Sequence, residues 1–279
     1  MPIKIPLFFL RHLRLIQGHK MFLYPKNSII TQMLSTFGVY ESLETEVVKK
    51  LIKKGDVVLD IGANVGYYTL IFAKLVGEEG KVFAFEPDPD NFALLEKNVE
   101  VNCYRNVVLV QKAIANKTGV VRLYLCEDNK GNHRICDARD ARESIAVEAI
   151  RLDDYFEAYN EKIDFIKIDI EGAEQEALLG ASSLLKRNKN IKIATEFCPL
   201  LLGAFGVKSE EYLCLLTQYG FELYDMDEQK YRMKPAIITE LLETYTPEMG
   251  NLTNLLCVRK NEQDKLVARF SNGNDTHEI

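Results

Sequence analysis

Short apolar runs alternate with helical patterns of apolar residues along the chain from residue 41 onward. The spacing of apolar positions predicts helices over residues 41–54, 66–76, 90–102, 173–186 and 209–219. The apolar runs predict seven strands, over residues 56–60, 81–86, 107–114, 163–169, 191–197, 221–225 and 255–259. A regular alternation of strands and helices is typical of a parallel sheet with helices on both faces, so we expect an α/β domain.

Two segments depart from this alternation. Between residues 115 and 153, the runs VVRLYL and AVEAIRL alternate like strands, and NKGN between them resembles a turn. We therefore expect a hairpin inserted between the third and fourth strands, or an excursion over the active face. The connection over 226–254 is expected to be long and non-helical. Such a connection can close a β-hairpin, so we expect the last strand to be antiparallel to the others.

The two ends of the chain differ from its centre in composition. Residues 1–40 are expected to form a helical or strand extension packed on a domain that spans 41–260, followed by a flexible polar tail over 261–279. The first 20 residues mix apolar and basic residues and favour an amphipathic helix packed on the domain, with membrane or partner contact as the alternative. Their longest uncharged apolar run, Ile5 to Leu10, is far shorter than the about 20 residues of a membrane span.

Composition narrows the class of protein. Hydrophobic residues make up 47% of the 279 residues, which is enough for a sizeable core. The net charge of −6 argues against non-specific nucleic-acid binding, which needs a basic surface. The six cysteines form no Cys-x-x-Cys pair, so we interpret them as reduced thiols and consider a zinc site unlikely. We expect a cytoplasmic protein without a transmembrane segment.

The stretch DIGANVGYYTL, residues 60–70, indicates a cofactor loop after the first strand. Gly62 and Gly66 stand four residues apart, but Asn64 occupies the position where a dinucleotide-binding loop has its second glycine, and it would crowd a pyrophosphate. Glu86 ends the second strand and can accept hydrogen bonds from both hydroxyls of a ribose. Asp60 would repel a pyrophosphate and suits a cationic ligand.

S-adenosylmethionine fits these features, because it carries a sulfonium, an ammonium and a ribose but no phosphate. Taken singly, Asp60 could instead cap a helix and Glu86 could be a solvated strand end. An NAD(P)-type Rossmann oxidoreductase is the main alternative function, although no tyrosine has a lysine four residues later, as the short-chain type requires. A non-catalytic protein that binds the cofactor or serves as a scaffold is a further alternative.

Several segments of the chain resemble the FkbM family of methyltransferases. They are VVLDIGANVGYYTL, FAFEPDP and DFIKIDIEGAEQEALLGA, with GVYESLETE and IRLDDYF as additional matches, and the resemblance covers roughly residues 18–200. It implies the Rossmann-like fold of class I S-adenosylmethionine-dependent methyltransferases. It also implies O-methylation of a hydroxyl on a small molecule, a glycan or a lipid-linked sugar. By position, the cofactor-binding residues would be Asp60, Gly62, Asn64, Gly66 and Glu86, with Glu41 closing the site.

The candidate catalytic residues follow two of the predicted strands, with Asp169 and Glu171 at the end of the fourth and His133 after the third. Asp169 and Glu171 occupy a strand-to-helix turn and can act as base, metal ligands or ammonium clamps. Open α/β sheets bind ligands at the carboxyl ends of their strands, so we expect Asp169 to line one crevice together with the strand ends Asp60, Glu86 and Glu196. Glu174 is assigned to the helix N-terminus, where a carboxylate stabilises the dipole. We assign no metal ligands, but leave a divalent metal open.

The segment DNKGNHRICD carries two further candidates. His133 is the histidine nearest the expected active face, and it could act as a base or contact the substrate, although a loop histidine is more often solvated. Arg134 could hold an anionic group of the substrate through two hydrogen bonds.

Overall fold

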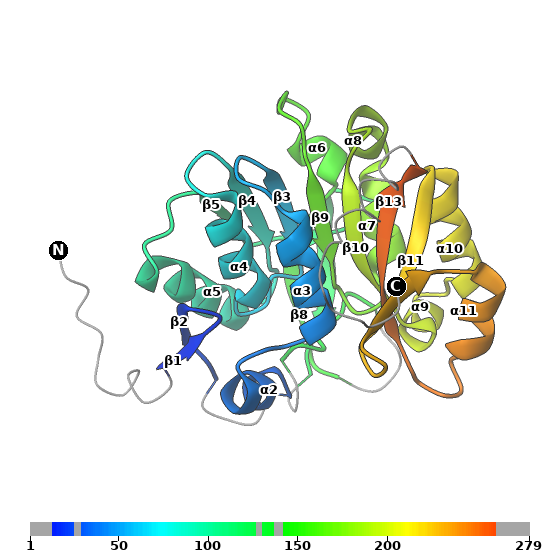
Figure 1. Cartoon of the computed structure of the whole chain (residues 1–279), viewed down its shortest axis with the longest axis horizontal. Helices are drawn as coiled ribbons and strands as arrows, with labels where there is room; N and C mark the ends of the chain where they lie inside the picture. The colour runs from blue at the N-terminus through cyan, green and yellow to red at the C-terminus, as the bar shows by residue number, and fades with distance from the viewer. Residues whose placement is uncertain (1–12, 25–28, 127–129, 137–141, 261–279) are drawn as a thin grey trace, which may run out of the picture.

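The computed structural model describes residues 13–24, 29–126, 130–136 and 142–260 (Figure 1). Its centre is a sheet in the order β12-β11-β13-β10-β9-β3-β4-β5. The eight strands are β3 (Val57–Ile61), β4 (Lys81–Phe85), β5 (Val107–Val110), β9 (Phe165–Ile168), β10 (Lys192–Phe197), β11 (Phe221–Asp227), β12 (Arg232–Pro235) and β13 (Thr253–Arg259). The strands from β10 to β5 are parallel, so the predicted mostly parallel α/β sheet is confirmed. The sheet has one strand more than the seven that we predicted.

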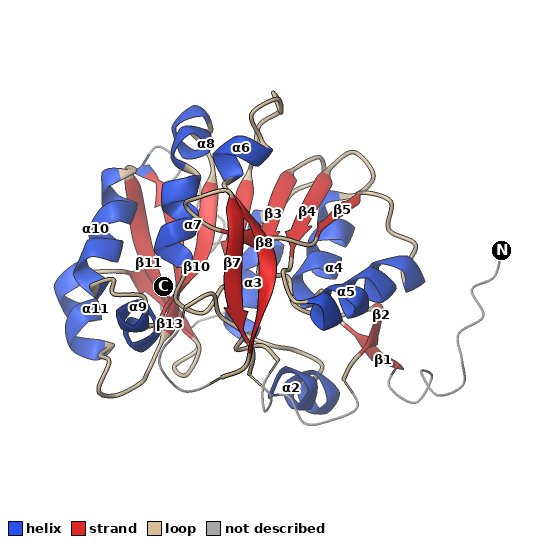
Figure 2. Cartoon of the chain, turned by 180° about the vertical axis from the view of Figure 1, so that it is seen from behind, coloured by secondary structure: helices blue, strands red, loops and turns tan. Residues whose placement is uncertain are grey.

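Helices cover both faces of this sheet because its central strands are apolar on both sides. Val57, Leu59 and Ile61 of β3 face one hydrophobic core, while Val58 faces the other. The helices α3 (Ser42–Leu51), α4 (Tyr67–Val76) and α5 (Pro89–Val101) cover one face (Figure 1). The opposite face packs against α6 (Leu152–Tyr155), α7 (Glu174–Gly180), α8 (Ser182–Arg187), α9 (Pro199–Ala204), α10 (Ser209–Gln218) and α11 (Ile238–Thr244) (Figure 2).

The strand predicted over 107–114 is interrupted. β5 ends at Val110, and β6 (Ala113–Ile114) leaves the central sheet to join a second, three-stranded sheet with β7 (Gly119–Tyr124) and β8 (Ser144–Ile150). β7 and β8 are antiparallel neighbours and lie over the face shown in Figure 2. The apolar run alone could not show this break, because both halves are apolar and buried against different partners.

The helix predicted over 173–186 is also divided, at Ala181. A side-chain carbon on Gly180 would lie 2.3 Å from the Ala115 carbonyl oxygen, so the end of α7 lies directly against the inserted sheet. α8 then begins anew because Asp153 accepts hydrogen bonds from the backbone N–H groups of Ser183 (3.0 Å) and Leu184 (2.9 Å). A carboxylate that caps a helix start from a distant segment leaves no local pattern in the sequence.

The connection over 226–254 is not non-helical, as we had expected. It contains the edge strand β12 and the helix α11, whose Leu241 is buried against the core. β12 turns back from β11 and pairs with it in antiparallel register. The predicted sheet of seven strands did not include this edge strand. β13 runs antiparallel to both of its neighbours, β10 and β11.

The N-terminal extension contains an antiparallel hairpin, β1 (Leu13–Ile16) and β2 (His19–Phe22), followed by the helix α2 (Ile29–Phe37). Ile16 and Met21 are buried, and the Asn98 side chain on α5 bonds both the N–H and the carbonyl group of Phe22. The amphipathic helix expected near the N-terminus is therefore wrong for residues 13–22. Residues 1–12 and the tail over 261–279 lie outside the described part of the chain. We retain the division at residues 40 and 260 as a proposal.

None of the helices in the described residues is long and apolar enough to cross a membrane.

Candidate active site

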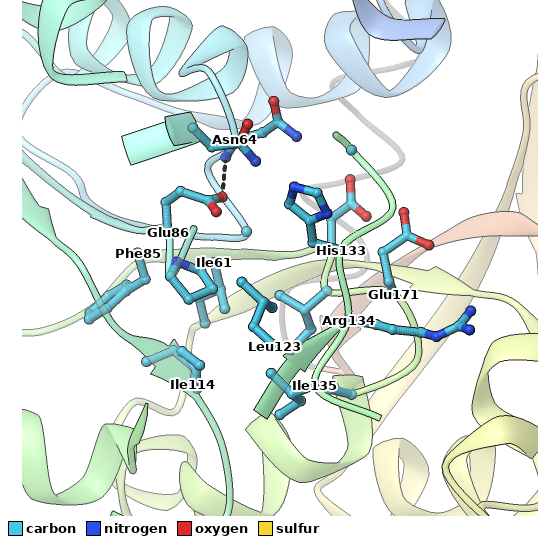
Figure 3. A pocket seen from close by; sticks show the side chains of 18 of the residues that line it. Ile61, Asn64, Phe85, Glu86, Ile114, Leu123, His133, Arg134, Ile135 and Glu171 are labelled. Carbon is cyan, nitrogen blue, oxygen red and sulfur yellow. Dashed lines mark hydrogen bonds between the residues drawn. The ribbon is translucent and has the colours of Figure 1, made fainter. Parts of the chain in front are cut away.

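Two adjacent cavities lie at the carboxyl ends of β3, β4 and β9. The first has apolar walls from Phe85, Ile114, Leu123 and Ile135 (Figure 3). The second lies beside α2 and the start of α4. Both are lined by Gly62, Asn64, Gly131, Asp169 and Glu171. Because these linings are shared, we treat the cavities as the two halves of one cleft that crosses the glycine loop.

The glycine loop lies directly against the end of β9. Gly62 has a φ of +85°, and a side-chain carbon there would lie 1.9 Å from the carbonyl oxygen of Asp169. Gly66 has a φ of +93° and begins α4. Asn64 also adopts a left-handed conformation, which its side chain stabilises by accepting a hydrogen bond from the Val65 N–H group at 2.8 Å. These positions keep bare backbone at the floor of the cleft.

Glu86 extends from the end of β4 into the first cavity (Figure 3). One carboxylate oxygen accepts from the Asn64 N–H group at 2.8 Å, and the other accepts from the Asp88 N–H group at 2.9 Å. Burial raises the pKa of Glu86 to about 7, while these two N–H groups oppose the rise. The Asn91 side chain also bonds this carboxylate. A carboxylate has about four acceptor sites, so acceptor capacity remains for a ligand hydroxyl.

Asp60 lies deeper than the sequence suggested. Its side chain is 1% exposed, borders the second cavity, and accepts a short hydrogen bond from the Thr69 hydroxyl in α4. Burial raises the pKa of Asp60 to about 6. The carboxylate therefore ties β3 to α4 as well as adding negative charge to the cleft. The role of Asp60 in binding a cationic ligand stays a prediction.

Glu41 does not line either half of the cleft among the described residues. Its carboxylate accepts from the Asn254 amide at 2.9 Å and from the Tyr68 hydroxyl at 3.2 Å. Tyr68 does line the second cavity, so Glu41 reaches the cleft only through that ring. The role of Glu41 as a residue that closes the site stays a prediction.

Four carboxylates gather at the carboxyl ends of β9 and β10, three in the turn after β9 and one near the end of β10. Asp169 and Glu171 line both halves of the cleft, and Glu171 has a strained left-handed backbone, with a φ of +57°. Burial and the neighbouring charge of Asp169 raise the pKa of Glu171 well above its ordinary value. Glu174 accepts from the N–H groups of Ile170 (3.1 Å) and Gly172 (3.2 Å) and so holds the turn closed. Its position supports the structural role that we assigned to it.

Glu196 lies near this group but lines neither cavity. Its side chain is 8% exposed, and one carboxylate oxygen has no hydrogen-bond partner among the described residues. Burial, followed by the charge of Glu171, raises the pKa of Glu196 well above its ordinary value. Three of the four acidic strand ends that we expected in one crevice thus border the cleft, and Glu196 stands behind it.

His133 and Arg134 belong to the inserted segment that covers the first cavity (Figure 3). His133 Nδ1 accepts from the Cys126 N–H group at 2.9 Å, and Nε2 lies 3.8 Å from an Asp88 oxygen. A neutral imidazole in this arrangement carries its proton on Nε2 and has no free basic nitrogen. Burial also lowers the pKa of His133. The geometry favours a role in holding the segment over a role as base.

The main residue that the sequence did not single out is Lys167. It is a lysine within the otherwise apolar strand FIKI, its side chain is buried, and it lines the second cavity. A charged residue in the middle of a buried central strand is the signal that could have identified it. In the described part of the chain, no group of three or more histidine, cysteine, aspartate or glutamate side chains could hold a metal ion.

The raised pKa values predict how stability depends on pH. The pKa of Glu174 is raised by burial to about 7, against an ordinary value near 4.5. The folded state therefore holds a proton that the unfolded chain releases between these values, so the free energy of unfolding falls as pH rises from about 4.5 to 7. Glu174→Gln keeps the acceptor oxygen but cannot titrate. We therefore expect the free energy of unfolding of this variant to decrease over the same pH range by less than that of the wild type, by on the order of 1–3 kcal/mol.

Chemical denaturation of the wild type and the variant at several pH values between 5 and 8 measures the difference. If the difference in free energy of unfolding between the wild type and the variant is the same at every pH from 5 to 8, the prediction is contradicted. Comparing the two proteins cancels titrating groups that do not interact with Glu174, such as Asp60 and Glu86, whose raised pKa values act in the same direction. Glu171 and Glu196 interact with Glu174, so their response is part of the measured difference.

The donor set of the cleft fits S-adenosylmethionine. A glycine floor, remaining acceptor capacity on Glu86 for a ribose, and several carboxylates for a cationic ligand are present, and the negative charge disfavours a pyrophosphate.

Comparison with known proteins agrees with this fit. Residues 60–223 match the methyltransferase FkbM domain. The 2-O-methyltransferase NoeI of Sinorhizobium fredii is 28% identical over 163 residues, covering 52% of this chain and 65% of NoeI. The 31-O-demethyl-FK506 methyltransferase FkbM of Streptomyces tacrolimicus is 30% identical over 159 residues, covering 46% of this chain and 60% of that protein.

A third relative is the hexuronic acid methyltransferase AglP of Haloferax volcanii, 26% identical over 148 residues. That match covers 51% of this chain and 58% of AglP, so the chain spans less than two thirds of each of these three relatives. The family match nevertheless extends over more than half of the chain and includes both the glycine loop and the turn after β9. The chain belongs to the FkbM family of S-adenosylmethionine-dependent methyltransferases.

Proposed function

We propose that this protein methylates a hydroxyl group of a small molecule, a glycan or a lipid-linked sugar. The observation that carries the proposal is the position of Asp169. Asp169 follows β9 and lines both halves of the cleft, and its backbone carbonyl lies against Gly62. A side chain placed there can contact an acceptor beside a cofactor that is held by the glycine loop and Glu86. The names of NoeI and FkbM, both O-methyltransferases, support the same reaction.

The cofactor would be held by the glycine loop and Glu86. Gly62 and Gly66 give backbone access, Asn64 fixes the loop to Glu86, and Glu86 accepts the ribose hydroxyls. Phe85 and Leu123 offer apolar walls for an adenine ring. Asp60 supplies negative charge in the second cavity for the cationic groups. When bound, S-adenosylmethionine supplies an electrophilic methyl group.

The acceptor would be handled by the carboxylates after β9. A hydroxyl oxygen must lose its proton as it attacks, and a positioned carboxylate can accept that proton. Asp169 is placed for this role, and Glu171 beside it is suited to hold the acceptor by a hydrogen bond, because its raised pKa favours the protonated form. We propose that His133 orders the covering segment, and that Arg134 contacts an acidic group of the acceptor, such as the carboxylate of a uronic acid.

Calorimetric titration with S-adenosylhomocysteine tests the proposal. We expect the wild type to bind this ligand and not NAD⁺. Glu86→Ala should weaken binding about 10- to 100-fold, because two hydrogen bonds to a charged acceptor are lost. Glu79→Ala, in the exposed turn after α4, serves as the control and should bind like the wild type.

Binding of NAD⁺, or no binding of S-adenosylhomocysteine, would overturn the assignment of the cleft. A positive result leads to a screen of hydroxylated acceptors, with release of S-adenosylhomocysteine as the readout. Neutral sugars, uronic acids and macrocyclic alcohols cover the acceptor classes that we propose.

A further inference from the structure

Lys167 places a positive charge in the interior beneath the second half of the cleft. Its side chain rises from the middle of β9 and is 3% exposed. The ammonium nitrogen lies 3.0 Å from a carboxylate oxygen of Asp169 and 3.8 Å from one of Glu44. It also lies 4.5 Å from the centre of the Tyr68 ring, which is a favourable cation–π position. Removing a charge from water is costly, so such a lysine needs all of these partners.

Several elements around Lys167 contribute polar groups. Asp60 is its register neighbour across the strands β3 and β9, Glu44 lies on α3, and Glu41 immediately precedes α3. Tyr68 on α4 and Asn254 on β13 donate hydrogen bonds to Glu41 and Glu44. Together with Asp169, four carboxylates surround this one cation. Glu41 and Glu44 have neutral donors of their own.

Asp169 is held differently from these glutamates. Within the described residues, the hydrogen bond to its carboxylate comes from Lys167. Glu171 and Glu196 are also close enough for their carboxyl groups to interact with that of Asp169. An opposite charge next to a carboxylate stabilises its ionised form. The ion pair with Lys167 thus sets the direction of the Asp169 carboxylate and places a positive charge beside it.

Lys167 itself is unsuited to accept a proton. Although burial opposes the charge, the carboxylates of Asp169 and Glu44 raise the pKa of Lys167 well above its ordinary value. The side chain therefore stays an ammonium at neutral pH and acts only through the groups that it holds.

We propose that Lys167 is a positioning residue for methyl transfer, which holds the Asp169 carboxylate in an ion pair at the boundary between the two halves of the cleft. The proposal rests on the proposed function, because it assigns Lys167 a role in delivering the group that handles the acceptor.

The first test compares pH–rate profiles of methyl transfer for Lys167→Met and the wild type, with the acceptor from the screen. Turnover should fall about 10- to 100-fold, within the range of ~10²–10⁴ that a positioned base supplies. The acid limb of the profile should move up by about 1–3 pH units, the usual effect of losing an adjacent opposite charge. Lys167→Arg should restore the position of the limb. Lys162→Met, an exposed lysine just before β9, is the matched control.

An unchanged acid limb in Lys167→Met would overturn the proposal, because a purely structural lysine would lower the rate without moving the limb. The proposal would also be overturned if Lys167→Met lowered the rate by the same factor in the Asp169→Asn variant as in the wild type, because the two residues would then act independently. If Lys167→Met fails to fold, Lys167→Met/Glu44→Gln removes one charge of each sign and keeps Asp169. The same shift of the limb is expected in that protein.

A second measurement needs no acceptor. The fall in Tm caused by Lys167→Met at pH 8 should be smaller by several degrees in the Asp169→Asn background than in the wild type. Additive changes in Tm would overturn the pairing. Calorimetry separates the two levels of inference. A wild type that does not bind S-adenosylhomocysteine refutes the proposed function, whereas binding with an unmoved limb refutes only the role of Lys167.

Discussion

Replacing Gly62 with alanine is expected to destabilise the protein by about 2–6 kcal/mol and to abolish measurable binding of S-adenosylhomocysteine. Two effects add at this position. A left-handed backbone costs a side chain on the order of 1–3 kcal/mol. The added carbon would lie 1.9 Å from the carbonyl oxygen of Asp169, which belongs to the backbone and cannot move aside cheaply, at a further cost of about 1–3 kcal/mol. Relief of this contact must displace the glycine loop or the turn after β9, and both shape the cleft.

The matched control is Gly203→Ala. Gly203 lies within α9, and a side-chain carbon there meets no atom within 4 Å, so the change should be close to neutral or slightly stabilising. Urea denaturation gives the stability of both variants, and calorimetry gives their affinity for S-adenosylhomocysteine. A Gly62→Ala protein with the midpoint and affinity of the wild type would show that the loop does not lie against β9 as described.

The order of strands and helices in the central sheet could be predicted from the sequence because each element is long enough to show its own period. The strands β3, β4, β9 and β10 are short runs of mostly apolar residues with buried side chains on both faces. The helices α4 and α5 between the first strands have clear boundaries. Features that depend on a distant partner could not be predicted in this way. Asp153 starts α8 from 30 residues away, and β12 forms only because β11 offers it an edge.

The candidate site shows the same distinction. Gly62 and Glu86 were recognisable because a loop at the end of a strand constrains residue type locally, through backbone conformation and access. The tautomer of His133 depends on a backbone N–H group seven residues away, and no property of the histidine itself indicates it. Lys167 is the clearest case. Its charge conflicts with its place in an apolar strand, and only the four carboxylates around it, drawn from three elements, explain why it is there.

Replacing Asp169 with asparagine is expected to lower methyl transfer about 10²- to 10⁴-fold while the affinity for S-adenosylhomocysteine changes less than about tenfold. Asparagine keeps the size of the side chain but removes its charge, so it cannot accept the proton that the acceptor hydroxyl loses. The contacts proposed for the cofactor are made by Gly62, Asn64 and Glu86, which the change does not touch. Lys167 retains Glu44 at 3.8 Å, so its charge keeps one partner.

Turnover is measured as release of S-adenosylhomocysteine with the acceptor found in the screen, and affinity by calorimetry. Asp154→Asn provides the matched control, because Asp154 lies on α6, at 43% side-chain exposure, and does not line the cleft among the described residues. A large loss of turnover with nearly unchanged affinity distinguishes an enzyme from a protein that only binds the cofactor. If turnover stayed within threefold of the wild type, Asp169 would not handle the acceptor, and Glu171, which lines both halves of the cleft, would become the next residue to replace.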